Sequence, residues 1–306
     1  MHNPASWWAH LHGSRVGATW EELLEGPSPE EVARAVALLE ARRAEQLAGG
    51  GGDGGPPACC QESRQQHAEG GGEGAAGGGA SSSSNPSTSS APAGGGGGGG
   101  ATLPGDGLLD IVPAAEWRSR LRSLLSAHPG SLVGEVGLDR AAVIPGSRAR
   151  VRFDHQLALL EEQLGLAAEL GRPVSVHCVR GYGHLLQLFQ RLARGDGAGC
   201  PPAVMLHSYG GSPEDVSRFS RLPGVGPRFF FSFSSAINAR NPDKLAARIR
   251  AVPDDRLLVE SDQVTPLLIE GGMVDICRIV ADAKGWGLEE AAARTLANFD
   301  AFYSRA

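Results

Sequence analysis

Residues 153–178, FDHQLALLEEQLGLAAELGRPVSVHC, hold the pattern that decides the fold: an amphipathic helix followed at once by a buried strand. Apolar residues recur at intervals of four, three, four and three from Phe153 to Ala167, which predicts one buried helical face. Gly171 and Pro173 then end the helix. The run PVSVHC that follows is short and apolar, as expected of a strand covered on both faces of a sheet.

The same alternation of helix and strand continues through the rest of the chain. Strands are predicted at 131–138, 173–178, 203–208, 228–234 and 256–261. Helices are predicted at 116–127, 153–167, 184–193, 213–222, 242–252, 272–284 and 288–297. Such alternation indicates parallel βαβ units and therefore an α/β fold. A closed barrel needs eight strands, so these five predict either an open sheet or part of a barrel.

Composition divides the chain into three parts. Residues 49–107 contain 22 of the 44 glycines and the run SSSSNPSTSS, so we expect a disordered, low-complexity Gly/Ser-rich insertion. Residues 1–48 before it offer a loop and one helix over 29–48, with Ser28 as its N-cap. Residues 108–306 carry the predicted βα units and form the main domain.

Charge and composition limit the partners. The 28 basic and 34 acidic residues give a net charge of −6, with no run of Lys and Arg. A broad basic surface for duplex DNA or an anionic membrane is therefore not expected. No apolar run is long enough to span a membrane, and the N-terminus lacks the pattern of a secretory signal. These features predict a cytoplasmic or nuclear protein with no membrane partner.

Four ionisable residues lie near the carboxyl ends of predicted strands: Glu135, His177, His207 and Asp262. Those ends meet on one face of a parallel sheet, which is where (β/α) enzymes build their sites. Imidazole and carboxylate groups together suit divalent ions such as Zn²⁺ and Mn²⁺. Each residue alone also has a structural explanation, since Glu135 can cap a turn and Asp262 can cap a helix. Their coincidence at four strand ends favours a metal site.

Several motifs in register resemble the TatD family of metal-dependent hydrolases. They are GEVGLDR (134–140), the segment 153–178, LHSYGGS (206–212), LLVESD (257–262) and NFDAFY (298–303). The likeness covers nearly all of residues 106–306, and it favours the branch of the family that has ESD where most members have ETD.

The resemblance implies a TIM barrel that hydrolyses phosphodiester bonds, typically in DNA, with one or two divalent metal ions (Mg, Mn or Zn). By resemblance, Glu135 bridges two metals, His177 and His207 bind one of them, and Asp262 binds the other and helps to activate water. Glu135 and Asp262 would then be the catalytic residues. Arg180, in the position of the family's VHxR arginine, would face the scissile phosphate. DNA ends or another phosphodiester are the implied substrates.

One departure from the family limits this expectation. Family members begin with an apolar strand that ends in HxH and supplies two metal ligands. His10 and His12 have that spacing, but only nine residues precede them and none forms a strand-like run. We therefore expect strands one to three of the barrel to be missing from this sequence, as in a truncated gene model, which leaves half of the metal site.

Two functions from different classes remain. The first is a metal-dependent hydrolase acting on ester bonds, a TatD-type deoxyribonuclease. The alternative is a non-catalytic interaction protein that uses a partial barrel as a scaffold for a protein partner. The open sheet edges expected at Val133 and Val259 motivate the second.

Overall fold

In the computed structural model, structure is described for residues 19–48, 112–194, 197–263 and 265–305. The predictions for His10 and His12 and for the low-complexity segment lie outside these residues. The limits of the three parts expected from composition also stay predictions. None of the helices in the described ranges is both long and apolar enough to cross a membrane.

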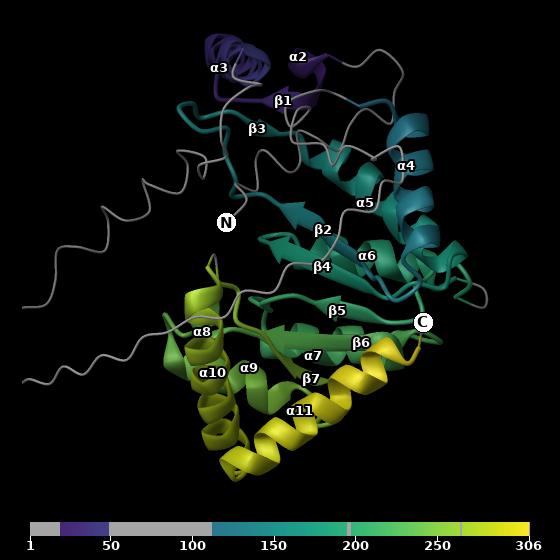
Figure 1. The fold of residues 1–306 in the computed structure, drawn as a ribbon, viewed down its shortest axis with the longest axis vertical. Coiled ribbons are helices and arrows are strands. Elements are labelled where there is room, and N and C mark those ends of the chain that lie inside the picture. The colour runs from purple at the N-terminus through teal and green to yellow at the C-terminus, as the bar shows by residue number, and fades with distance from the viewer. Residues whose placement is uncertain (1–18, 49–111, 195–196, 264, 306) are drawn as a thin grey trace, which may run out of the picture.

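A five-stranded parallel sheet forms the centre of the molecule (Figure 1). Its strands are β2 (Val133–Asp139), β4 (Val174–Val179), β5 (Val204–Leu206), β6 (Phe229–Phe233) and β7 (Leu257–Val259). They pair in chain order, β2-β4-β5-β6-β7, so each strand of this sheet lies beside the strand that follows it in the sequence. This confirms the predicted α/β class and the five predicted strands. Within the described part the sheet is an open segment of a barrel, with β2 and β7 at its edges.

Helices connect and cover these strands. The longer ones are α4 (Ala114–Ala127), α5 (Phe153–Glu169), α6 (Tyr182–Leu192), α7 (Pro213–Ser220), α9 (Pro242–Ala251), α10 (Ile269–Lys284) and α11 (Leu288–Tyr303). Short turns of helix occur at α8 (Ser235–Asn238), η3 (Gly226–Arg228) and η4 (Pro266–Leu268). Ser212 and Asn241 cap α7 and α9 with their side chains, and proline begins each helix.

The main core lies between the sheet and these helices. All five residues of β6 are buried, which explains why FFFSF reads as a continuous apolar run rather than an alternating one. Phe229 packs edge-on against Phe189 of α6 at 4.8 Å between ring centroids. Such aromatic contacts hold the sheet rigid beneath the strand ends where the ionisable residues lie.

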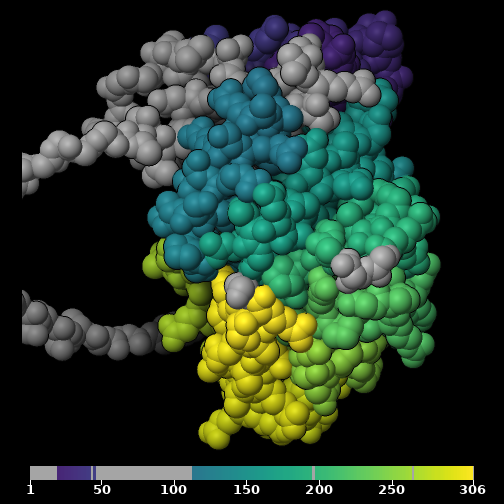
Figure 2. Space-filling view, turned by 90° about the vertical axis from the view of Figure 1, so that its right-hand side faces the viewer, coloured from purple at the N-terminus to yellow at the C-terminus, as the bar shows by residue number. Residues whose placement is uncertain are grey.

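A second, smaller core packs residues 20–39 against residues 142–151. It contains α2 (Trp20–Leu23), β1 (Leu24–Glu25), α3 (Pro29–Ala48) and β3 (Arg150–Val151). β1 and β3 pair antiparallel, with Leu24 opposite Val151. Figure 2 shows α2 and α3 (purple) at the opposite end of the molecule from α11 (yellow). The predicted helix at 29–48 is confirmed, and the backbone amide of Glu31 donates to Ser28 Oγ at 3.4 Å.

Candidate functional site

The strands run toward the left in Figure 1, so their carboxyl ends lie on the left of the sheet. The four predicted site residues come together at these ends. His177 Nδ1 lies 3.0 Å from Glu135 Oε1. His207 Nε2 lies 3.7 Å from Glu135 Oε2 and 3.3 Å from Asp262 Oδ2. Glu135 therefore stands between two imidazoles that come from adjacent strands.

The sequence of β2 explains how Glu135 reaches His177. Glu135 is inside the strand, four residues before its end, and the register shifts between Val133 and Val136. Beyond that irregularity Gly137 pairs with His177 of β4. Glu135, Gly137 and Asp139 are spaced two residues apart, so they lie on the same face of the strand. The two carboxylates therefore flank the imidazole of His177, and the glycine leaves room between them.

Gly137 is required in this position by its backbone. Its φ is +151°, and a Cβ there would collide with the carbonyl oxygen of His177. Only glycine adopts such a conformation without strain. The glycine of the GEVGLDR motif therefore holds β2 and β4 close together directly at the site.

Both histidines use one ring nitrogen for the centre and the other for an outer carboxylate. His177 Nε2 lies 3.2 Å from Asp139 Oδ2, and Asp139 is almost fully buried. His207 Nδ1 lies 2.6 Å from Glu260 Oε2. These outer carboxylates fix the orientation of each ring and leave His177 Nδ1 and His207 Nε2 directed at Glu135.

Serine hydroxyls also bind the carboxylate of Glu260, which directly follows β7. Glu260 Oε1 accepts hydrogen bonds from the backbone amide of Ser208 at 2.6 Å and from its hydroxyl at 2.7 Å. Ser232 Oγ donates to the same oxygen at 3.0 Å. Ser208 Oγ also lies 2.9 Å from Asp262 Oδ2. The Ser208 hydroxyl therefore lies between the carboxylates of Glu260 and Asp262, and its one proton is shared between them.

The backbone supports this arrangement. Ser208 and Asp262 both have positive φ angles, +39° and +47°, directly after or near the ends of their strands. Non-glycine residues adopt this region rarely, and it is common at functional sites. The Asp262 carboxylate lies against His207, and the Ser208 hydroxyl lies against Glu260 and Asp262.

The charges of the cluster shift each other's pKa values. Burial alone would lower the pKa of His177, but its hydrogen bonds to Asp139 and Glu135 raise it to about 9. The pKa of His207 rises to about 11 for the same reason, against burial and through Asp262 and Glu260. The hydrogen bond from His207 lowers the pKa of Asp262. Without a metal, the cluster is therefore a set of ion pairs with protonated imidazoles.

The donor set fits a divalent ion in chemistry, but its side chains are hydrogen-bonded to one another. Ligands about 2.1 Å from one ion lie about 3.0–3.6 Å from each other. The pairs at the centre are 3.0 Å (His177 to Glu135) and 3.3 Å (His207 to Asp262). As the side chains stand, no group of three or more His, Cys, Asp or Glu in the described ranges closes on one ion. Binding therefore requires these side chains to turn from each other toward a shared point.

Arg180 follows β4 on the same face. Its side chain is exposed and its φ is +54°. No carboxylate in the described part of the chain forms an ion pair with it, so its charge is available to a ligand.

The sequence reasoning missed Asp139, Glu260 and Ser208. Asp139 could have been found from alternation, because it lies on the same side of the strand as Glu135 and at the strand end. Glu260 is two residues before Asp262, so the same period of two applies. Nothing in the sequence indicates that Ser208 would join the two carboxylates.

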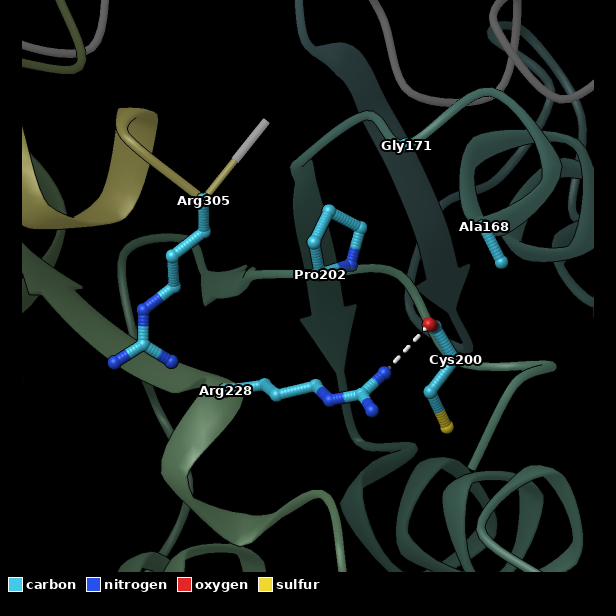
Figure 3. A pocket seen from close by; sticks show the side chains of 6 residues that line it. All are labelled: Ala168, Gly171, Cys200, Pro202, Arg228 and Arg305. Atoms are coloured by element: carbon cyan, nitrogen blue, oxygen red, sulfur yellow. Dashed lines mark hydrogen bonds between the residues drawn. The ribbon is translucent and has the colours of Figure 1, made fainter. Parts of the chain in front are cut away.

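A surface hollow of about 550 Å³ lies at the other end of the sheet, lined in part by Cys200, Arg228 and Arg305 (Figure 3). Arg228 Nη1 donates to the carbonyl oxygens of Gly197 and Cys200 at 3.1 and 2.8 Å. Arg305 Nη1 donates to that of Pro227 at 2.7 Å. Both arginines thus stabilise loops at the amino ends of the strands, away from the cluster of histidines and carboxylates.

Fold and site together define a parallel α/β protein of the barrel type, with histidines and carboxylates gathered at the carboxyl ends of its strands. A family model described as TatD related DNase matches residues 109–304, and the chain belongs to this family.

Three curated relatives have similar sequences. The Cut9-interacting protein scn1 of Schizosaccharomyces pombe is 31% identical over 228 residues, which cover 62% of this chain and 68% of scn1. The metal-dependent hydrolase YcfH of Escherichia coli is 32% identical over 189 residues, covering 58% of this chain and 64% of YcfH. A deoxyribonuclease of Saccharomyces cerevisiae, named as uncharacterized, is 27% identical over 145 residues, covering 43% of this chain and 45% of that protein. The chain thus spans about half to two thirds of their lengths.

Among solved structures, YJJV, a TatD homologue from Escherichia coli, is similar with a TM-score of 0.48 at 22% identity. The superposition covers 62% of this chain and 71% of that one.

Proposed function

We propose that this chain hydrolyses phosphodiester bonds in nucleic acid with the help of a divalent metal ion. The observation that carries the proposal is the paired orientation of the two imidazoles. Each directs one ring nitrogen at Glu135 and binds an outer carboxylate, Asp139 or Glu260, with the other. Carboxylates behind ligating histidines are characteristic of metal sites, where they set the tautomer and the ring orientation.

Glu135, His177, His207 and Asp262 are the residues that would hold the metal. When bound there, a divalent ion would lower the pKa of water and offset charge on the phosphoryl oxygens. Without metal, Ser208 and His207 both contact Asp262 Oδ2. Asp262 could accept a proton from attacking water through the carboxylate oxygen that does not hold the metal. Its lowered pKa keeps it ionised for that role.

The relatives support this reaction class. YcfH is named a metal-dependent hydrolase and the Saccharomyces relative a deoxyribonuclease. The net charge of −6 favours single strands or ends over tight binding to duplex DNA. The metal's identity is open to Mg²⁺, Mn²⁺ or Zn²⁺, all of which accept these donors. A cytoplasmic or nuclear location accords with a nucleic-acid substrate.

The test is hydrolysis of bis(p-nitrophenyl) phosphate and of a single-stranded oligonucleotide by the full chain with Mn²⁺ or Mg²⁺. We expect EDTA to abolish turnover and the double change His177→Ala, His207→Ala to lower it at least about 100-fold. Asp139→Asn should lower it by about 10–100-fold through its effect on His177. His128→Ala, at an exposed position after α4, is the matched control and should keep wild-type activity. Full turnover by the double variant would contradict the assignment.

A second function is favoured by exposed apolar side chains beside the open edge of the sheet. Leu267 is 90% exposed, Leu296 of α11 62% and Phe299 48%. Large exposed apolar side chains on neighbouring helices are typical of interaction surfaces. The relative scn1 is named for its interaction with Cut9, which is consistent with a protein partner for this chain. Absence of turnover with all three metals, together with a stable complex with a purified protein partner, would favour this alternative.

A further inference from the structure

Two arginines stand side by side at the rim of the candidate site. Arg140 directly follows β2, and Arg180 directly follows β4. The last pair of the two strands is Asp139 with Val179, and the backbone amide of Arg140 donates to the carbonyl oxygen of Val179 at 3.1 Å. Both side chains are exposed. The rim of the site is therefore basic where its centre is acidic.

A third arginine extends the basic rim. Arg150 of β3 donates from Nη1 to the carbonyl oxygen of Arg140 at 3.0 Å. It also lines, with Arg148 and Val143, a surface hollow of about 520 Å³. Hollows of this size accommodate small ligands. The rim thus continues from Arg180 through Arg140 to a concave surface.

The charges of these three arginines are not neutralised by carboxylates. In the described part of the chain, Arg140, Arg150 and Arg180 form no ion pair with a carboxylate, whereas the nearby Arg152 pairs with Asp154. Glu25 also lines the hollow and lies opposite Arg150 across the β1–β3 pair, without an ion pair. Asp139 is directed away, toward His177 and the amides of the following turn.

Arg140 is also held in place. Its guanidinium lies 4.8 Å from the centroid of the Phe153 ring, and His184 packs edge-on against that ring at 4.9 Å. Cation–π contact fixes the plane of the guanidinium and leaves its N–H groups for a ligand. A planar fork of donors suits a phosphate group, which it can bind through two oxygens.

We propose that Arg140 and Arg150 bind a phosphate group of a nucleic-acid strand next to the scissile phosphate, which Arg180 would face. The inference rests on the proposed function and narrows its substrate class: the preferred substrate is a strand with several phosphates, rather than a single phosphodiester. The hollow beyond Arg150 then takes the adjoining part of the strand.

The test is binding of a fluorescent single-stranded oligonucleotide to the full chain in EDTA, measured by anisotropy at several salt concentrations. We expect Arg140→Ala, Arg150→Ala to raise Kd at least about tenfold and to reduce the salt slope by about 1.4, the value for two lost contacts with a single strand. Arg140→Lys, Arg150→Lys keeps the charges and should retain most of the slope. Arg221→Ala, Arg250→Ala removes two exposed arginines elsewhere and should leave Kd within about twofold.

Binding and hydrolysis separate this inference from the proposed function. Arginine-dependent binding without hydrolysis would support the subsite and contradict the phosphodiesterase. Hydrolysis with unchanged Kd and slope in the double Ala variant would overturn the subsite and leave the phosphodiesterase. Failure of the wild-type chain to bind the oligonucleotide would overturn the subsite as well.

Discussion

Gly137 links the sequence motif to the geometry of the site. Its backbone contacts the carbonyl of His177 so closely that no side chain fits, and the carboxylates of Glu135 and Asp139 flank the same imidazole. The distance between β2 and β4 and the position of His177 therefore depend on the absence of one methyl group.

We expect Gly137→Ala to lower the free energy of unfolding by about 3 kcal/mol, because the methyl group meets backbone atoms that cannot move independently. Urea unfolding followed by circular dichroism measures the change. Gly165→Ala is the matched control: nothing lies within 4 Å of a Cβ at this exposed position of α5, and alanine should stabilise the helix by about 1 kcal/mol. Equal effects at the two positions would refute this account of Gly137.

Part of the site could be predicted from residues alone. Glu135, His177, His207 and Asp262 follow apolar runs, and parallel strands bring such positions to one face. The hydrogen-bond partners of the two histidines were harder to predict. Asp139 can be placed at the end of its strand from the sequence, but its contact with His177 cannot. Ser208 contributes through a positive φ, which the sequence does not show. Sequence patterns give the face of an element on which a side chain lies, whereas hydrogen-bond partners depend on how neighbouring strands are set against each other.

At the scale of elements, the longest helices follow from periodicity, and all five strands of the main sheet follow from short apolar runs. The pair β1–β3 does not, because two residues per strand are too few to show alternation. Glu135 was expected near the carboxyl end of the strand predicted at 131–138, but it lies four residues before the end of β2 and still reaches the site. The irregular register near Val136 allows this, and it leaves no mark in the hydrophobic pattern.

The last helix depends on one buried amide. Asn298 Nδ2 donates to the carbonyl oxygens of Asp254 and Leu257, at 2.8 and 2.9 Å, and so joins α11 to the beginning of β7. Asn298→Ala leaves both oxygens without this donor and should cost about 2 kcal/mol of unfolding free energy. Asp300→Ala, exposed on the same helix, should change it by less than about 0.5 kcal/mol. A small effect of Asn298→Ala in urea unfolding would show that α11 is held by its apolar contacts alone.

At the scale of the whole molecule, the site makes stability depend on pH and on metal. The raised pKa values of His177 and His207, about 9 and about 11, mean that their ion pairs stabilise the metal-free fold fully below pH 6.5. This stabilisation is lost as pH rises through those values. The lowered pKa values of Glu135, Asp139 and Asp262 give stability that is lost as pH falls below the usual carboxyl range.

We therefore expect the EDTA-treated chain to lose at least about 1 kcal/mol of unfolding free energy between pH 6.5 and 9.5. Saturating Mn²⁺ should raise Tm and remove this alkaline loss, because metal binding needs neutral imidazoles. Urea unfolding and thermal unfolding across pH, each with and without Mn²⁺, measure the two effects. The double variant His177→Asn, His207→Gln should show neither, and a wild-type profile that is flat without metal would contradict the ion-pair description.

The small core formed by α2, β1, α3 and β3 has a consequence for the covalent chain. Leu24 pairs with Val151, and Glu31 Oε2 accepts from the backbone amide of Arg148 at 3.0 Å, across 117 residues of sequence. A break in the backbone between residues 49 and 111 would leave these contacts intact. Two separately made polypeptides, one ending and one beginning within that stretch, should reassemble by fragment complementation, and their affinity would report what the small core contributes.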